Sequence, residues 1–170
     1  MKNWNNRTVR TIVLAAAALA VIFGVGRGLN PRPAAVSGYS DMRVADLDGR
    51  IFSMREQRGK VVLVNFWATW CPPCVRETPA LARMYRDFSA RGFTAVGISL
   101  DEGEREVREF VRRYQVPYPV ARSGDSGPGS NLESLPVTVL IDKQGHTAKS
   151  YFGLIDEDTV RAEIERLLAD

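Results

Sequence analysis

The stretch GKVVLVNFWATWCPPCVRETPAL, residues 59–81, contains the signals that decide the fold. Its VVLVNFW segment is an apolar run, interrupted only by Asn65, of the kind that forms a strand buried on both faces of a sheet. From Cys71 onward the pattern becomes helical. Apolar residues then recur at i, i+3, i+4 and i+7, on Leu81, Met84, Tyr85 and Phe88. The stretch therefore predicts a central strand, a short turn and a helix that begins at the cysteines.

The segment that follows repeats this order of elements. Gly92 is expected to end the first helix, and FTAVGISL, residues 93–100, has the composition of a second buried strand. The next segment, EREVREFVRRY, residues 104–114, predicts an amphipathic helix. Its apolar stripe consists of Val107, Phe110, Val111 and Tyr114. Strand, helix, strand and helix in succession indicate a parallel βαβ unit.

Two hairpins complete the expected sheet. VTVLID and HTAKSYFG, residues 137–142 and 146–153, flank a turn at Lys143-Gln144-Gly145 and precede a last helix. That helix carries Val160, Ile164, Leu167 and Leu168 on its apolar side. Near the start, Asp48-Gly49 is a strong turn signal between two short strands. We expect an α/β sandwich with a mixed central sheet and an added N-terminal hairpin, and a surface loop over the Gly/Ser-rich residues 121–134.

Composition and charge exclude several classes of protein. The 170 residues are 45% hydrophobic and 25% charged, which suits one globular domain with a real core. Five basic residues precede the first acidic one, so the 23 basic and 20 acidic side chains leave residues 41–170 without a basic excess. We therefore expect no nucleic-acid partner.

The N-terminus has the pattern of an export signal. Residues 11–26 are uncharged and largely apolar, and they follow a basic leader, residues 1–10. This length lies between a cleavable signal core and a full membrane span. We favour an uncleaved signal-anchor, with a cleaved signal peptide as the alternative, and a tether over residues 27–40. The positive-inside rule then places a domain of residues 41–170 on the extracytoplasmic, periplasmic side of the cytoplasmic membrane.

Cys71 and Cys74 are the two cysteines of the chain, and their spacing makes them a candidate redox site. Cys71 would be the N-cap of the helix, with Pro72 and Pro73 in the first turn. The N–H of Cys74 and the helix dipole would then lower the pKa of the Cys71 thiol and make it the nucleophile. Cys74, one turn inward, would be the resolving thiol.

Other interpretations of the cysteine pair remain open at this stage. The pair could be buried without a chemical role, or it could be half of a zinc site. A zinc site needs four ligands, and His146 is the one histidine of the chain, so we expect no metal and no cofactor. A thiol oxidase, a non-catalytic copper-binding chaperone that uses both thiolates, and a thiol peroxidase are the remaining alternatives.

The motifs WATWCPPCVRETPAL, GKVVLVNFW and LPVTVLIDKQG resemble the thioredoxin superfamily, and more narrowly its membrane-tethered TlpA, ResA and CcmG group. The resemblance covers residues 41–170 and implies a thioredoxin fold. It assigns the nucleophile to Cys71 and the resolving role to Cys74. It also implies a cis-proline at Pro136, whose loop faces the cysteines, so that Trp70, Leu135 and Pro136 would contact a bound substrate. Pro79 matches the kink of the active-site helix.

Glu77 is the third candidate catalytic residue. It lies three positions after Cys74, on nearly the same helix face. Thioredoxin itself has a buried acid at the position that Asn65 occupies here, whereas the TlpA-like group has an acid at the Glu77 position. Partial burial would raise the pKa of Glu77 and make it a proton acceptor for Cys74. The alternative is an ordinary first-turn glutamate stabilised by the helix dipole.

The resemblance also implies a function. It suggests an enzyme, a monomeric protein-disulfide reductase that receives electrons from a membrane thiol reductase. Its clients would be exported proteins with disulfides, such as apocytochrome c in cytochrome c-type biogenesis, or copper-site proteins. The same chemistry run in reverse, as an oxidase, is the main alternative.

Overall fold

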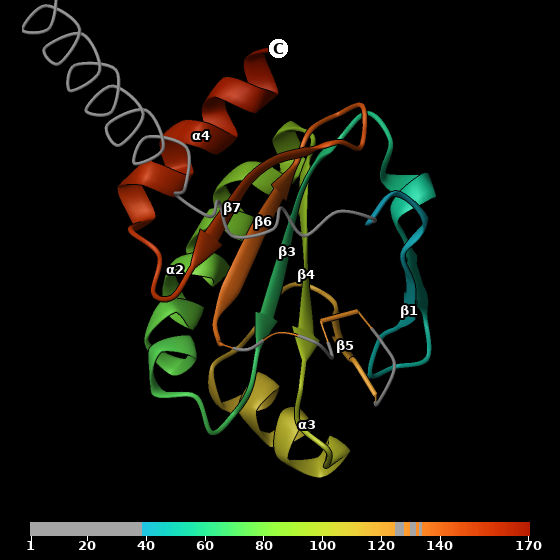
Figure 1. The fold of residues 1–170 in the computed structure, drawn as a ribbon, viewed down its shortest axis with the longest axis vertical. Coiled ribbons are helices and arrows are strands. Elements are labelled where there is room, and N and C mark those ends of the chain that lie inside the picture. Colours follow the sequence, from blue (N-terminus) through green and yellow to red (C-terminus); the bar gives the residue numbers. More distant parts are fainter. Residues whose placement is uncertain (1–38, 125–127, 130–131, 133) are drawn as a thin grey trace, which may run out of the picture. The chain divides into compact units, whose positions relative to one another are not determined.

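The computed structural model describes residues 39–124, 128–129, 132 and 134–170 (Figure 1). The expected leader, signal-anchor and most of the tether lie outside these residues. Within the described part, no helix has both the length and the apolar character needed to cross a membrane. The first element, η1 (Tyr39–Asp41), includes Tyr39 and Ser40, which the sequence assigned to the tether.

A five-stranded mixed sheet forms the centre of the domain, with the strand order β5-β4-β3-β6-β7. The central strand β3 pairs in parallel with β4 and antiparallel with β6, while β5 and β7 form the edges. All seven residues of β3 are buried, as expected for a strand covered on both faces. The strands are β3 (Val61–Trp67), β4 (Phe93–Ser99), β5 (Val120–Arg122), β6 (Val137–Ile141) and β7 (Thr147–Phe152).

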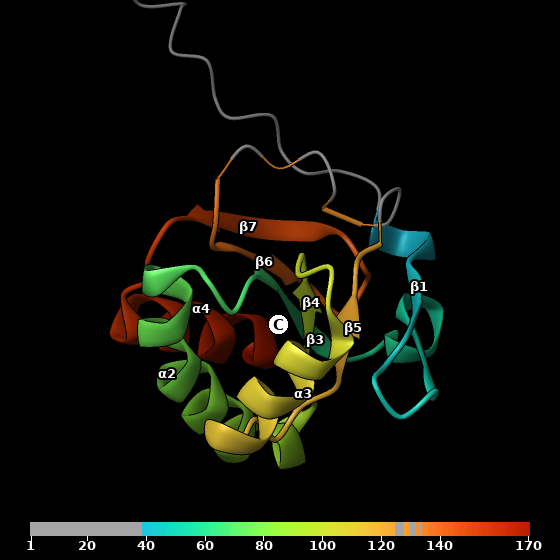
Figure 2. The ribbon, with the colours of Figure 1, turned by 90° about the horizontal axis from the view of Figure 1, so that it is seen from below.

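One face of the sheet packs against the helices α2 (Pro72–Phe88), α3 (Glu104–Arg113) and α4 (Glu157–Ala169) (Figure 2). Alternate residues of β3 point toward this face, because side chains alternate along a strand. Val61, Leu63 and Trp67 therefore join the helix cluster. The helices contribute mainly Leu81, Met84, Phe88, Val107, Phe110, Val160, Ile164 and Leu167.

The opposite face of the sheet packs against the N-terminal segment. Val62, Val64 and Phe66 of β3 belong to this second cluster. Its other members come from η1, the hairpin strands β1 (Arg43–Ala45) and β2 (Ile51–Ser53), and η2 (Met54–Gln57), and include Tyr39, Val44, Phe52 and Met54, with Met42 between η1 and β1. The expected hairpin is thus confirmed, with Gly49 at a φ of 80° in its loop. The mixed α/β architecture predicted from the sequence is confirmed as well.

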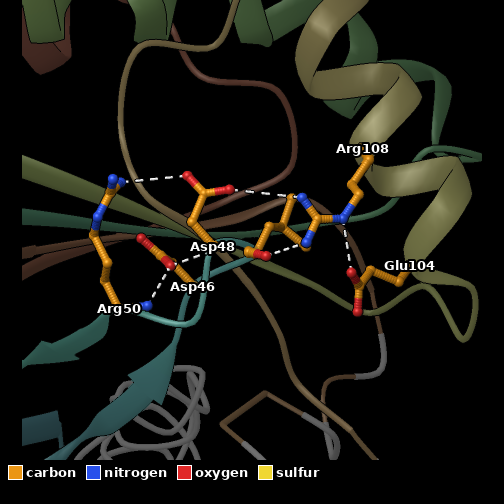
Figure 3. A network of polar contacts seen from close by, with 6 residues as sticks. Asp46, Asp48, Arg50, Glu104 and Arg108 are labelled. Carbon is orange, nitrogen blue, oxygen red and sulfur yellow. Dashed lines mark hydrogen bonds and ion pairs between the residues drawn. The ribbon is translucent and has the colours of Figure 1, made fainter.

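The hairpin is fixed to the edge of the main sheet and to α3. Leu47 N–H donates to the Val120 carbonyl over 2.8 Å. On the other side, Arg108 of α3 donates to the Leu47 carbonyl, pairs with Glu104 and lies 3.6 Å from Asp48 (Figure 3). These contacts hold the added hairpin beside β5 in one arrangement.

Two local predictions differ from the structure. The helix that starts at the cysteines ends at Phe88, and a 3-10 turn, η3 (Ser89–Arg91), continues to Gly92, whose φ is 90°. The segment 121–134 is also not a loop throughout, because Ala121 and Arg122 belong to the edge strand β5. A strand of three residues has too little hydrophobic pattern to be recognised from the sequence.

Candidate active site

The turn between β3 and α2 presents the cysteine pair. Cys71 N–H donates to the Ala68 carbonyl over 3.2 Å, which closes a tight turn. Helix α2 begins at Pro72, and Cys71 is its N-cap. The Cys71 sulfur accepts a hydrogen bond from Cys74 N–H at 3.3 Å. The N-cap geometry predicted from the sequence is therefore confirmed, with the donor that the two prolines leave available.

The two cysteines are joined in a disulfide, and both are almost completely buried. Cys71 lines a surface groove of about 320 Å³. The groove is formed by Trp70, Cys71, Pro72, Pro73, Leu100, Leu132, Ser134 and Leu135. Cys71 is thus the sulfur that a molecule in the groove would meet, whereas Cys74 lies one helical turn further in.

Two of the three predicted substrate-binding residues, Trp70 and Leu135, line this groove, and the third, Pro136, directly follows Leu135. Trp70 is 68% exposed, an unusual state for a tryptophan, and it forms one wall. Leu135 also lines the groove and precedes Pro136 through a cis peptide bond, as the resemblance implied. Pro136 is buried, and its carbonyl accepts from Gly153 N–H over 2.8 Å. The structure thus brings Trp70, Cys71 and the cis-proline loop to one place.

Glu77 is buried, with 2% of its surface exposed. Its Oε1 accepts from the side chain of Asn65 at 2.8 Å, and its Oε2 accepts from Ile155 N–H at 3.4 Å. Burial raises the pKa of Glu77 to about 7, because desolvation outweighs the two hydrogen bonds that favour the carboxylate. The burial that the sequence analysis made the condition for a raised pKa is present, which leaves an acid that can change protonation near neutral pH.

Asn65 connects Glu77 to the strand that follows the cis-proline. Its side-chain amide donates both to Glu77 and to Thr138 Oγ1, the latter over 3.0 Å. Asn65 and Thr138 are direct partners in the register of β3 and β6. From the resemblance, Asn65 occupies the position at which thioredoxin has its buried acid. No pattern in the sequence indicated that the side chain of Asn65 would hydrogen-bond Glu77.

The sequence also missed residues that complete the site from distant segments. Leu100 and Leu132 line the groove, and Asp101 hydrogen-bonds the turn before Cys71. Leu100 and Asp101 follow the end of β4, and the carboxyl ends of parallel strands are where α/β proteins place sites. Their position just after a predicted parallel strand was therefore the signal in the sequence that could have identified Leu100 and Asp101 as site residues.

His146 lies in the turn between β6 and β7, and its ring is 3.6 Å from the Asp142 carboxylate. The described residues contain no group of three His, Cys, Asp or Glu side chains arranged to hold a metal ion.

A thioredoxin-type mixed sheet, with a cystine at the N-terminus of the helix after its central strand, defines a thiol-disulfide oxidoreductase. A model of the AhpC/TSA family matches residues 38–165, and the chain belongs to this family.

Named relatives agree with this class. The chain is similar to the thiol-disulfide oxidoreductase ResA of Halalkalibacterium halodurans, with 34% identity over 71% of this chain and 69% of the relative. It is 28% identical to ResA of Geobacillus thermodenitrificans, over 98% of this chain and 99% of the relative. These similarities agree with an enzyme that exchanges thiols and disulfides.

Solved structures show the same fold. A putative thioredoxin from Neisseria meningitidis matches with a TM-score of 0.70 and 30% identity, over 76% of this chain and 88% of the other. A putative thiol:disulfide interchange protein DsbE from Chlorobium tepidum matches with a TM-score of 0.71 and 24% identity, over 76% and 94% of the two chains.

Proposed function

We propose that this protein is a reductase that acts outside the cytoplasm and transfers two electrons from its dithiol to disulfides of exported proteins. One observation carries the proposal. A buried carboxyl group, Glu77, with its pKa raised to about 7, lies on the helix turn that follows Cys74. Such a group can accept the proton of the resolving thiol at neutral pH, which a reductase needs in the step that releases its client.

The first step is attack by Cys71. In the reduced protein, the Cys74 N–H and the N-terminus of α2 stabilise the Cys71 thiolate. The thiolate attacks one sulfur of a client disulfide in the groove. A bond forms between Cys71 Sγ and that sulfur, the client disulfide breaks, and its second sulfur leaves as a thiolate that takes a proton from water.

The second step is resolution by Cys74. Glu77 accepts the proton of the Cys74 thiol, and the resulting thiolate attacks Cys71 Sγ. The mixed disulfide breaks, the client departs with two reduced sulfurs, and the protein is left with the Cys71–Cys74 disulfide. An external dithiol must then reduce this disulfide, and we assign that role to a membrane thiol reductase.

The groove suits an extended client segment. Trp70 and Leu135 give its lining apolar surface, and Cys71 belongs to the same lining. A peptide in an extended conformation could bury apolar side chains against both residues and place a cystine at Cys71. Trp70, Leu135 and the Pro136 loop would therefore be the substrate-binding residues.

The extracytoplasmic location rests on the sequence. The apolar residues 11–26 behind a basic leader support a signal-anchor in the cytoplasmic membrane. Apocytochrome c and copper-site proteins, which expose cysteine pairs before metal or haem is inserted, are the clients we propose. Labelling of intact cells with a membrane-impermeant thiol reagent, after mild reduction, should modify Cys71, and protection of Cys71 until the cells are lysed would contradict this location.

Trapping tests the reductase role. The Cys74→Ala variant keeps the nucleophile but cannot resolve, so it should accumulate mixed disulfides with exported clients that can be isolated and identified. The Cys71→Ala variant is the matched control and should trap none. Recovery of the electron donor alone, with no exported client, would count against the proposal.

The reduction potential separates a reductase from an oxidase. A value nearer to about −270 mV, as in thioredoxin, supports reduction of clients. A reduction potential of roughly −120 mV, as in strongly oxidising proteins of this fold, would instead indicate an oxidase.

A further inference from the structure

A second buried acid lies behind the active-site turn. Asp101 follows the end of β4 and is 8% exposed. Its carboxylate accepts from Thr69 N–H at 2.9 Å, from Thr69 Oγ1 at 2.5 Å and from Ser99 Oγ at 2.7 Å. The steps described above do not use this side chain. Two of its three hydrogen bonds go to one residue of the turn that presents Cys71.

Thr69 occupies a critical place in that turn. The turn runs from Ala68 to Cys71 and is closed by the hydrogen bond between them, so Thr69 and Trp70 are its two central residues. Asp101 binds both the backbone N–H and the hydroxyl of Thr69, which fixes the first central peptide and its side chain together. Trp70 and Cys71, the two groove residues that follow, take their positions from this peptide.

The same corner is tied to the rest of the groove. Leu100 N–H donates to the Trp67 carbonyl over 2.9 Å, and Leu100 lines the groove. Arg122 of β5 donates to the Asp101 carbonyl over 3.2 Å. Hydrogen bonds with β3 and β5 therefore fix the backbone around Asp101, while the carboxylate of Asp101 hydrogen-bonds the turn before Cys71.

We infer that Asp101 is a positioning residue for thiol-disulfide exchange, which acts through Thr69 to place Cys71 Sγ and Trp70 at the groove. This inference rests on the proposed function and adds to it the group that sets the geometry of the nucleophile. Exchange needs the attacking sulfur in line with the disulfide, and small displacements of a reacting atom cost large factors in rate. The role belongs to the hydrogen bonds of Asp101, not to its charge.

An asparagine at position 101 separates the effect of the hydrogen bonds of Asp101 from the effect of its charge. In Asp101→Asn, the amide oxygen can occupy the place of Oδ2 and accept from Thr69 N–H and Ser99 Oγ. The amide nitrogen then occupies the place of Oδ1 and donates to Thr69 Oγ1, since a hydroxyl can accept as well as donate. The variant removes the charge and keeps all three contacts, whereas Asp101→Ala removes the contacts.

A second pair of variants approaches the same contact from Thr69. Thr69→Val deletes the hydroxyl but keeps the shape and the backbone N–H, and Thr69→Ser keeps the hydroxyl. Thr69 is partly exposed and belongs to no helix or strand, so these changes are expected to leave the fold intact even if Asp101→Ala does not fold.

The experiment measures two properties of the reduced full-length variants. One is the second-order rate constant for exchange with a disulfide-bonded peptide, and the other is the pH profile of Cys71 alkylation by iodoacetamide. We expect Asp101→Ala to exchange about tenfold more slowly and Thr69→Val several-fold more slowly, with both alkylation profiles displaced to higher pH because the N-cap bond to Cys71 is weakened. Asp101→Asn and Thr69→Ser should stay within about threefold of the wild type in rate, with unchanged profiles.

Two results would overturn the inference. One is a folded Asp101→Ala or Thr69→Val variant with the rate and the alkylation profile of the wild type. The other is an Asp101→Asn variant as slow as Asp101→Ala, because the charge would then be what matters. Failure of the wild-type protein to reduce any peptide disulfide would defeat the proposed function instead, and the alkylation profiles would still test the positioning role.

Discussion

The amide of Asn65 donates to the carboxyl group of Glu77 over 2.8 Å, and both side chains are buried. Two residues on different elements thus share one buried polar contact, with Asn65 on the central strand and Glu77 on the helix that carries the disulfide. This bond offsets only part of the desolvation cost of an ionised Glu77, so the pKa of Glu77 rises to about 7. The resulting acid is both a cost to stability and a usable proton acceptor.

The first prediction concerns stability and pH. Because the pKa of Glu77 is raised in the folded protein, its contribution to stability is fully present below about 4.5 and is lost as pH rises through about 7. The loss amounts to roughly 3 kcal/mol. The Glu77→Gln variant should lack this decline, so its free energy of unfolding relative to the wild type should improve from pH 4.5 to pH 8. Guanidinium unfolding of the oxidised proteins across this range measures it, and parallel pH curves would contradict the prediction.

The second prediction concerns the partner of Glu77. Asn65→Leu removes the donor that favours the carboxylate, so the pKa of Glu77 should rise further. If Glu77 accepts the proton of Cys74, the pH profile for release of a peptide from the mixed disulfide should move to higher pH. Thr138→Val is the matched control, because it removes the other contact of Asn65 and leaves the Asn65–Glu77 bond in place. Equal profiles for Asn65→Leu and the wild type would exclude the proton-acceptor role.

The third prediction concerns the exposed tryptophan. Trp70→Ala should change the free energy of unfolding by no more than about 0.5 kcal/mol, because the side chain is 68% exposed. Exchange with a disulfide-bonded peptide should slow several-fold through a higher KM, while exchange with a small aromatic disulfide should change less. Ile51→Ala, at a hairpin residue that is 50% exposed, is the control and should leave both reactions unchanged. Loss of both reactions to the same extent would show that Trp70 acts on Cys71 and not on the peptide.

The fourth prediction tests the packing behind the active-site turn. A Cβ atom at Gly97 would lie 2.9 Å from Trp67 Nε1, with Tyr118 and Val120 also in contact. Gly97→Ala should therefore destabilise the protein by about 1 to 3 kcal/mol through overpacking. In a Trp67→Phe background, the smaller ring should relieve the clash and reduce this cost. Chemical denaturation of the four proteins gives the coupling, and additive effects would show that the two sites do not meet.

Local patterns were sufficient for the elements that build the site. The apolar run before Cys71, the helical spacing after it and the two prolines of the first turn predicted β3, α2 and the N-cap bond, because each depends on neighbours in the sequence. The turn at Asp48-Gly49 predicted the hairpin in the same way.

Contacts between residues far apart in the chain could not be predicted from the sequence alone. The pairing of Asn65 with Glu77 follows from how α2 packs across β3, and the contact of Asp101 with Thr69 joins residues 32 positions apart. The edge strand β5 is likewise defined by its pairing with β4 and not by its own composition. These contacts surround the cysteine pair and join distant segments, so they became visible only in the folded structure.

The placement of Cys71 at the groove also constrains the order of events. On the proposed function, a client that takes electrons and a donor that restores them would both react with Cys71 in the same groove, so we expect them to bind in turn without a ternary complex. Steady-state kinetics with both varied should give parallel double-reciprocal lines, as in a ping-pong scheme. Excess client should slow turnover because it competes with the donor for the same groove. The supply of client or of donor in the cell would then control the rate of turnover.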